Sequence, residues 1–90
     1  MPDRTREEWQ QRFQEAPDEE LIRLLVHDLR GPLTGLISAT RLLSTEQTNA
    51  EQIRELGQIL HRAAHNMELI LEAVLEQDRS RRSHLPDDHA

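Results

Sequence analysis

Apolar side chains recur at alternating spacings of three and four residues along two long stretches of this chain, a pattern typical of helices that pack in bundles. In the first stretch the main stripe consists of Ile22, Val26, Leu29, Leu33, Leu36, Thr40 and Leu43. A second stripe beside it consists of Leu21, Leu25, Pro32, Ala39 and Leu42. Because the apolar face is this wide, the pattern predicts one long helix over 17–44 that contacts more than one neighbour.

The second stretch predicts another long helix, over 49–80. Its stripe consists of Ile53, Leu56, Leu60, Ala63, Met67, Ile70 and Val74, and it is widened by Ile59, Leu71 and Leu75. Thr48 and Glu51 form a capping-box pattern at its start. Because only residues 45–48 separate the two helices, we expect an antiparallel hairpin.

A shorter helix is predicted over 5–15, within an N-terminal segment 1–16. Thr5 and Glu8 again form a capping-box pattern, and Trp9 and Phe13 lie one turn apart on the same face. This aromatic pair indicates either a helix packed on the end of the bundle or the remnant of an upstream signalling helix. Residues 83–90 are charged, contain a proline and are interpreted as a tail or linker.

One hairpin, over 17–82, cannot cover two wide apolar faces, whereas two hairpins can. The chain has 90 residues and 2% aromatic residues, so a single copy buries a thin core that oligomerisation would supplement. The sequence therefore predicts an all-α fold, an antiparallel helical hairpin that forms a homodimeric four-helix bundle.

Charge and composition narrow the function classes. The formal net charge is −6, which makes nucleic acid and anionic lipid poor partners. No apolar run is long enough to span a bilayer, the charged N-terminus is unlike a signal peptide, and cysteine is absent. We expect a cytoplasmic location and no membrane contact by this segment, although a parent protein could be membrane-anchored.

The pair Gly31-Pro32 interrupts the first long helical pattern. In a helix interior proline costs about 3 kcal/mol and glycine about 1 kcal/mol relative to alanine. Pro32 removes the hydrogen bond to the carbonyl of Asp28, and a residue before proline is pushed away from helical geometry. The sequence therefore predicts a helix bend at Gly31 and Pro32, one turn after His27, and such broken rules often mark functional sites.

His27 is the candidate reactive group at this bend. In the heptad frame it lies beside the main stripe and faces solvent, and a neutral imidazole nitrogen is a competent nucleophile near pH 7. A carboxylate from Asp28 on one ring nitrogen would fix the tautomer and leave the other nitrogen free. The alternative interpretation of His27 alone is a solvated surface histidine.

The run His27-Asp28-Leu29-Arg30-Gly31-Pro32-Leu33 resembles the H-box of sensor histidine kinases. That motif has a histidine, an acidic, an aliphatic and a basic residue, a variable position, proline and leucine. The aliphatic run over 67–75 also resembles the end of that family's domain, so the resemblance covers most of the chain, about 17–82. It implies a dimerisation and histidine-phosphotransfer domain of two-component signalling.

The resemblance also implies roles for individual residues and partners. His27 would accept the γ-phosphoryl of ATP and pass it to an aspartate of a response-regulator receiver domain, with Asp28 as general base. No asparagine box or glycine-rich nucleotide box occurs in this sequence, so no cofactor is expected in this chain, and a separate catalytic domain would bind ATP and magnesium. Candidate contacts for the regulator are Arg30, Thr34, Ser38, Arg41, Gln52, Glu55 and Arg62.

In relatives that also dephosphorylate their regulator, the position four residues after the histidine is often Thr or Asn. This sequence has Gly31 there. A side chain there could orient the attacking water, so glycine predicts weak phosphatase activity or another route.

Two other functions stay open from the sequence. The chain could be a stand-alone dimerisation or scaffold protein, or a phosphorelay phosphotransferase without its own kinase domain. His61, His65 and Glu68 can share a helix face and could hold zinc, but a solvated face is favoured, and we predict no metal site.

Overall fold

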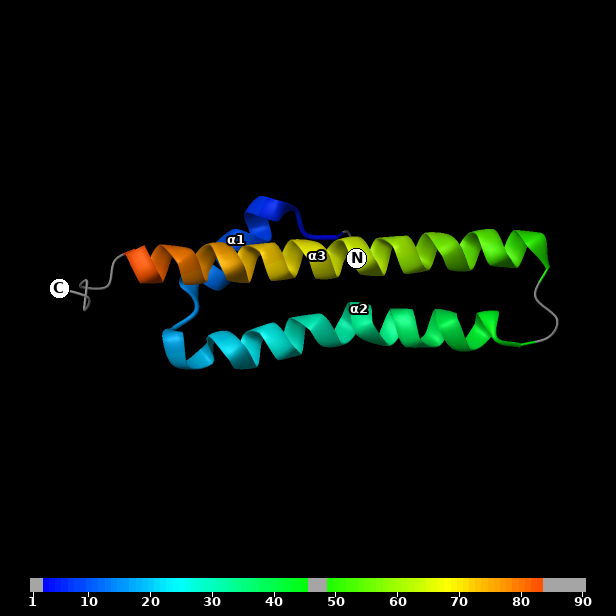
Figure 1. The fold of residues 1–90 in the computed structure, drawn as a ribbon, viewed down its shortest axis with the longest axis horizontal. Helices are drawn as coiled ribbons and strands as arrows, with labels where there is room; N and C mark the ends of the chain where they lie inside the picture. Colours follow the sequence, from blue (N-terminus) through cyan, green and yellow to red (C-terminus); the bar gives the residue numbers. More distant parts are fainter. Residues whose placement is uncertain (1–2, 46–48, 84–90) are drawn as a thin grey trace.

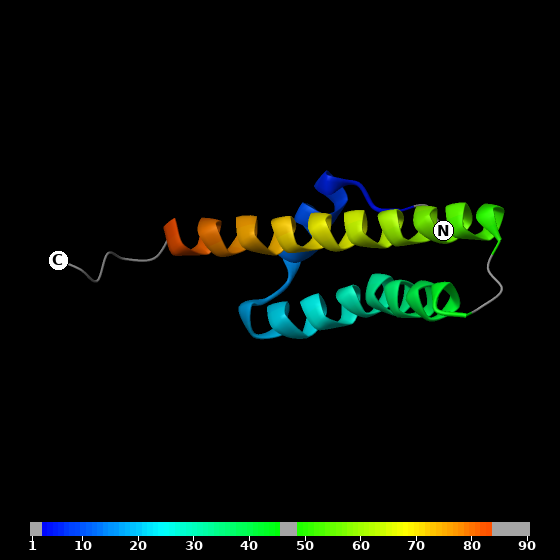
Figure 2. The same ribbon diagram turned by 45° about the vertical axis from the view of Figure 1, so that its right-hand side comes forward.

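The computed structural model describes residues 3–45 and 49–83, and all of its regular elements are helical. They are α1 (Arg6–Glu15), a 3-10 turn η1 (Asp18–Glu20), α2 (Leu21–Leu43) and α3 (Ala50–Ser83). α2 and α3 run side by side in opposite directions (Figures 1 and 2). The predicted all-α helical hairpin is confirmed. Within the described ranges, no helix is long and apolar enough to cross a membrane.

Side-chain caps start the first and last helices. At α1, the Glu8 backbone N–H donates to the Thr5 hydroxyl at 3.2 Å, and the Thr5 N–H donates to the Glu8 carboxylate at 3.1 Å, so the predicted capping box is confirmed. These hydrogen bonds lower the pKa of Glu8. At α3, Asn49 and Gln52 exchange the equivalent bonds, at 2.8 and 3.0 Å. The predicted Thr48–Glu51 cap involves Thr48, which lies outside the described residues.

The long helices differ from their predicted bounds where α1 joins the hairpin. Pro17 is extended (ψ 152°), so the α-helix begins at Leu21 after a 3-10 turn and not at position 17. The Arg81 guanidinium donates to the Ala16 carbonyl at 2.7 Å and pairs with Asp18 at 2.6 Å. α3 extends beyond position 80 to Ser83, and Arg81 near its end binds the segment that joins α1 to α2. Ser83 belongs to α3, and the rest of the predicted tail, 84–90, lies outside the described residues.

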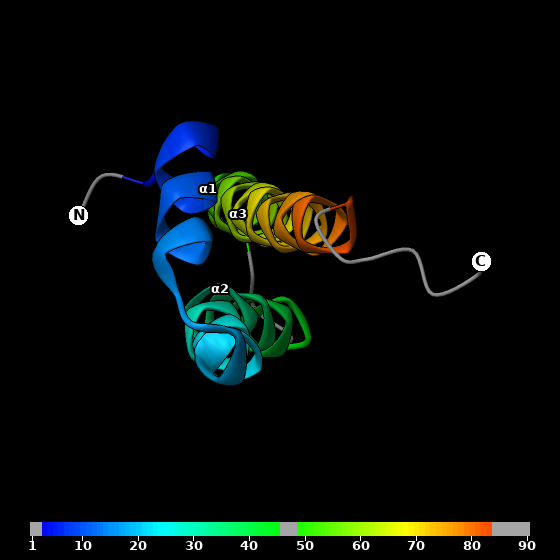
Figure 3. The same ribbon diagram turned by 90° about the vertical axis from the view of Figure 1, so that its left-hand side faces the viewer.

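The main core forms where α1 crosses the hairpin. Phe13 is fully buried, and its ring stacks on that of Trp9 with centroids 6.0 Å apart. Both rings pack against Leu69, Ile70 and Ala73 of α3, with leucines of α2 around them. Of the two alternatives for the aromatic pair, packing on the hairpin is the one observed (Figure 3).

Neither apolar stripe of α2 is buried along its whole length. The second stripe faces α3 over most of its length, with Ala39 buried and Leu21, Leu25 and Pro32 half-buried, whereas Leu42 is 54% exposed. The main stripe is divided: Ile22 is 73% exposed and Val26 53%, and Leu33 and Thr40 are also exposed. Its other members, Leu29, Leu36 and Leu43, are half-buried, and Leu29 packs against the core. On α3 the predicted stripe does face inward from Leu56 to Val74, whereas Ile53 is exposed.

α1 covers one side of the hairpin and leaves the other open. Leu24 and Asp28, which contact α1, lie on one flank of the inward stripe of α2. At about 3.6 residues per turn, Ile22, Val26 and Leu33 lie on the other flank. On α3, the exposed Ile53, Leu71 and Leu75 lie on that same side of the hairpin, away from Leu69 and Ala73, which pack with α1. Among the described residues no element covers this exposed apolar face (Figure 3).

Candidate functional site: a histidine, a carboxylate and an arginine

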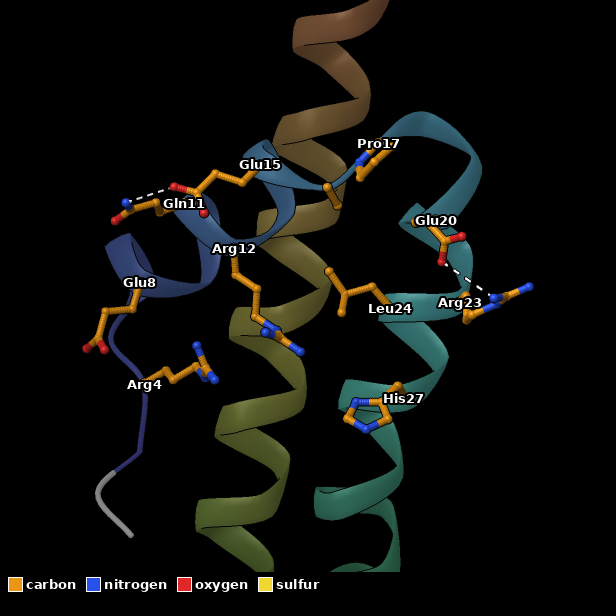
Figure 4. A pocket seen from close by; sticks show the side chains of 11 residues that line it. Arg4, Glu8, Gln11, Arg12, Glu15, Pro17, Glu20, Arg23, Leu24 and His27 are labelled. Atoms are coloured by element: carbon orange, nitrogen blue, oxygen red, sulfur yellow. Dashed lines mark hydrogen bonds and ion pairs between the residues drawn. The ribbon is translucent and has the colours of Figure 1, made fainter.

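His27 projects from the first half of α2, on the part of the hairpin that α1 crosses. Its side chain is 76% exposed, as the heptad frame predicts for a position facing solvent. Figure 4 shows the imidazole at the edge of a pocket between α1 and α2, open to solvent. A large partner can therefore reach the ring.

Asp28 is oriented quite differently from its neighbour. Its carboxylate is only 6% exposed, and its Oδ1 lies 3.0 Å from Nδ1 of His27. Because an ionised carboxylate only accepts hydrogen bonds, Nδ1 carries the proton and donates it. The other ring nitrogen, Nε2, then holds a free lone pair and has no hydrogen-bond partner among the described residues. This is the geometry that the sequence predicts for a nucleophilic imidazole.

Arg12 of α1 completes the site, and sequence reasoning missed it. Its Nε donates to Oδ2 of Asp28 at 2.5 Å and its Nη2 to Oδ1 at 2.9 Å, a bidentate pair. The one available signal was indirect: Trp9 and Phe13 indicated a docked helix, and Arg12 flanks that apolar face.

The Arg12 contact controls the charge of Asp28. Burial by itself would raise the pKa of Asp28, but the hydrogen bonds from Arg12 and then from His27 outweigh it and hold this pKa below 3.8. The same contact raises the pKa of Arg12. Asp28 is thus an ionised, buried carboxylate that bonds an arginine on one side and the exposed histidine on the other.

A pocket of about 660 Å³ lies between α1 and the start of α2, with His27 in its lining. The charged side chains that line it include both arginines and glutamates, and Figure 4 shows them around the opening. They are Arg4, Arg12, Arg23, Glu8, Glu15 and Glu20. Arg23 pairs with Glu20 at 3.7 Å, so part of this charge is already neutralised within the chain.

Gly31 and Pro32 do not break α2. The helix continues from Leu21 to Leu43 through both residues, and no glycine has a positive φ. Gly31 therefore does not leave helical geometry as the sequence suggested, while the predicted bend of α2 at Gly31 and Pro32 stays a prediction. Pro32 still lacks the N–H that would bond the carbonyl of Asp28.

The predicted regulator contacts are all exposed: Arg30, Thr34, Ser38, Arg41, Gln52, Glu55 and Arg62. A shallow pocket of about 470 Å³ brings Glu55 and Arg62 of α3 beside Gly31 and Pro32. Thr34, Ser38 and Arg41 lie farther along α2. The Gln52 side chain is occupied in the cap of α3, and Arg62 lies 3.7 Å from Asp3.

His61 and His65 stack with ring centroids 6.5 Å apart on α3. In the described part of the chain, no group of three His, Cys, Asp or Glu residues is arranged to hold a metal ion.

Fold and site together define a helical hairpin that presents an exposed histidine beside a buried carboxylate. Comparison with protein families gives the same class: the His Kinase A (phospho-acceptor) domain matches residues 18–83. The chain belongs to this family, whose members are phosphoacceptor and dimerisation modules of histidine kinases. The match begins after α1, so Arg12 lies outside it. Neither the search of curated proteins nor that of solved structures found a match.

Proposed function

We propose that His27 is the phosphoacceptor of a two-component sensor kinase and passes its phosphoryl group to an aspartate of a receiver domain. The observation that supports this most strongly is the pairing of an exposed imidazole with a buried carboxylate on Nδ1. A solvated surface histidine would not need a desolvated partner, since burying a carboxylate is costly unless it is paired.

The chemistry follows from the tautomer. The Nε2 lone pair of His27 attacks the γ-phosphorus of ATP, the bond from that phosphorus to the bridging oxygen breaks, and ADP leaves with the electron pair. The ring gains positive charge as the N–P bond forms, and the Asp28 carboxylate stabilises it by accepting the hydrogen bond or the proton of Nδ1. A receiver aspartate then attacks the phosphorus, and the N–P bond breaks.

Two partners are needed for this cycle. A separate catalytic domain holds ATP and magnesium and delivers the γ-phosphoryl group to the exposed ring. The receiver domain docks along α2 and α3 between His27 and the connection of the hairpin, where the exposed polar residues include Arg30, Thr34, Ser38 and Glu55.

A second copy of the hairpin covers the exposed apolar face and completes a four-helix bundle. This face includes Ile22, Val26, Leu33, Leu71 and Leu75, which are 44–73% exposed in one chain. A continuous apolar surface along two helices is typical of an interface. α1 does not obstruct it, because α1 lies on the opposite side (Figure 3).

The test is site-mapped phosphorylation. The chain is treated with potassium phosphoramidate, a small phosphodonor, or with ATP and a histidine-kinase catalytic domain, and the products are mapped by mass spectrometry. We expect an acid-labile gain of one phosphoryl group on His27 that His27→Gln abolishes. His61→Gln is the matched control, since His61 is also exposed but lies on α3. No gain, or a gain that survives His27→Gln, would exclude the phosphoacceptor role and leave a dimerisation scaffold.

A further inference from the structure

Helix α1 reaches the phosphoacceptor site through one side chain. Arg12 is bound to both carboxylate oxygens of Asp28, at 2.5 and 2.9 Å, and Oδ1 also accepts the bond from His27 at 3.0 Å. The Arg12 side chain is 27% exposed and Asp28 only 6%, so the contact is sheltered from water. A bidentate pair fixes the plane of a carboxylate, which a single hydrogen bond does not.

The anchoring of α1 indicates that this contact is built into the fold. Phe13 and Trp9 of α1 pack in the core with α3, and Arg6 of α1 forms an ion pair with Glu72 of α3. Arg81 fixes the connection after α1 by binding the Ala16 carbonyl and Asp18. Figure 4 shows Arg12 extending from α1 across the groove toward α2. Its position is thus determined by a packed helix and not by a free terminal segment.

We propose that Arg12 is a positioning residue of the phosphoacceptor site, which holds Asp28 in the orientation that bonds Nδ1 of His27. This inference rests on the proposed function of His27 and extends the site to a helix outside the family match. Arg12 acts through Asp28: it keeps the carboxylate ionised and fixed, so that the nucleophilic nitrogen of His27 is Nε2. Removing α1 or Arg12 would leave a buried carboxylate without its main partner.

The ionisation of Asp28 should then depend on Arg12. In the described residues, the groups that act on Asp28 are Arg12 from α1 and His27 from its own helix, and no titratable group of α3 contributes. Burial raises the pKa of Asp28, and Arg12 is the first of the groups that lower it. Without Arg12, Asp28 takes up its proton at a higher pH, and the support of Nδ1 is lost earlier on acidification.

The experiment compares Arg12→Gln with wild type by two readouts. Two-dimensional ¹H–¹⁵N spectra of the imidazole report the tautomer of His27 and need no phosphoryl donor. We expect wild type to hold the Nδ1–H form and Arg12→Gln to shift toward the mixture found for free histidine. The second readout is the rate of His27 phosphorylation by phosphoramidate between pH 5 and 8. We expect a loss of about tenfold in Arg12→Gln, less than the roughly 100-fold or more that a positioned acid or base contributes, because Asp28 itself remains.

Three further variants separate positioning from simple loss of structure. Arg6→Gln removes an ion pair of α1 that does not involve Asp28 and should leave tautomer and rate unchanged. Arg12→Lys keeps the charge but not the bidentate geometry and should rescue only part of the rate. In an Asp28→Asn background, Arg12→Gln should cause no further loss, because Arg12 acts through that carboxylate.

The outcomes distinguish this inference from the proposed function. Wild type that shows the Nδ1–H tautomer but no phosphorylation at His27 would refute the function and retain the positioning role. Phosphorylation that is equally fast in Arg12→Gln, with an unchanged tautomer, would refute the positioning role alone. A faster rate in Arg12→Gln, or equal losses in Arg12→Gln and Arg6→Gln, would also overturn it.

Discussion

Replacing Phe13 with alanine tests whether α1 is an integral part of this domain. Phe13 is 0% exposed and is one of the two largest fully buried side chains, together with Ile70 of α3. Its ring stacks on Trp9 and packs with the core residues of α3. Deleting the ring therefore leaves a cavity at the contact that holds α1 on the hairpin.

Phe13→Ala should lower the free energy of unfolding by about 3 kcal/mol, the lower end of the range for replacing a buried phenylalanine with alanine. The lower end applies because α1 lies at the periphery and can shift to fill part of the cavity. A domain of this size has a free energy of unfolding of roughly 5–13 kcal/mol, so the loss is a large fraction. With a urea m-value of about 1 kcal/mol/M, the unfolding midpoint should fall by about 3 M.

Trp9 makes the assay specific, because the chain contains one tryptophan and α1 carries it. Its emission reports the docking of α1, while circular dichroism reports the hairpin, both at one fixed protein concentration. We expect a red-shifted Trp9 emission in Phe13→Ala before any urea is added. Gln14→Ala, an exposed change on the same helix, should alter stability by less than about 0.5 kcal/mol. If Phe13→Ala matched wild type in emission and midpoint, α1 would not be docked as described.

The remaining predictions concern the dimer, the phosphatase reaction and acid. Leu71→Glu, a charge on the exposed apolar face, should give monomers by light scattering at micromolar concentration, whereas Gln58→Glu, an exposed change outside that face, should stay dimeric. A wild-type monomer would refute the bundle. A Cβ at Gly31 meets no atom within 4 Å, so Gly31→Asn should fold and speed dephosphorylation of the receiver; no gain would refute the role assigned to that glycine. The pKa of Asp28 is lowered on folding. Its ion pair with Arg12 therefore gives the folded state its full stabilisation above the unfolded pKa of 3.8, and this stabilisation is lost as the pH falls through the folded pKa. The stability difference between wild type and Arg12→Gln, about 1–3 kcal/mol in urea at pH 6, should therefore shrink at pH 3, and an equal difference at both would contradict this.

The hairpin could be predicted because its signals are local. The three–four spacing of apolar residues defines each long helix, and the capping pair Thr5–Glu8 defines the start of α1. The choice between the two stripes of α2 could not be predicted in the same way. Both stripes are apolar with the same period, so periodicity alone does not say that Ile22 and Val26 are exposed while Leu21 and Leu25 are half-buried.

The site was predicted only in part for a similar reason. His27 and Asp28 are adjacent in sequence, so their contact lies within α2 and does not depend on how the helices pack. Arg12 lies 16 positions from Asp28 on another helix, and its contact depends on how α1 crosses the hairpin. Crossing geometry is set by packing of Phe13 and Trp9, which no local pattern encodes. At Pro32 a local rule predicted that the preceding Gly31 leaves helical geometry, but α2 stays helical through both residues.

The most direct test of the central claim is the identity of the phosphorylated atom. Phosphorus NMR of the chain after treatment with phosphoramidate, combined with site mapping, separates phosphorylation at the two ring nitrogens and among the histidines. Because Asp28 engages Nδ1 of His27 at 3.0 Å, we predict a single phosphoramidate on Nε2 of His27. Phosphorylation on Nδ1 of His27, or on another histidine with His27 unmodified, would contradict the account.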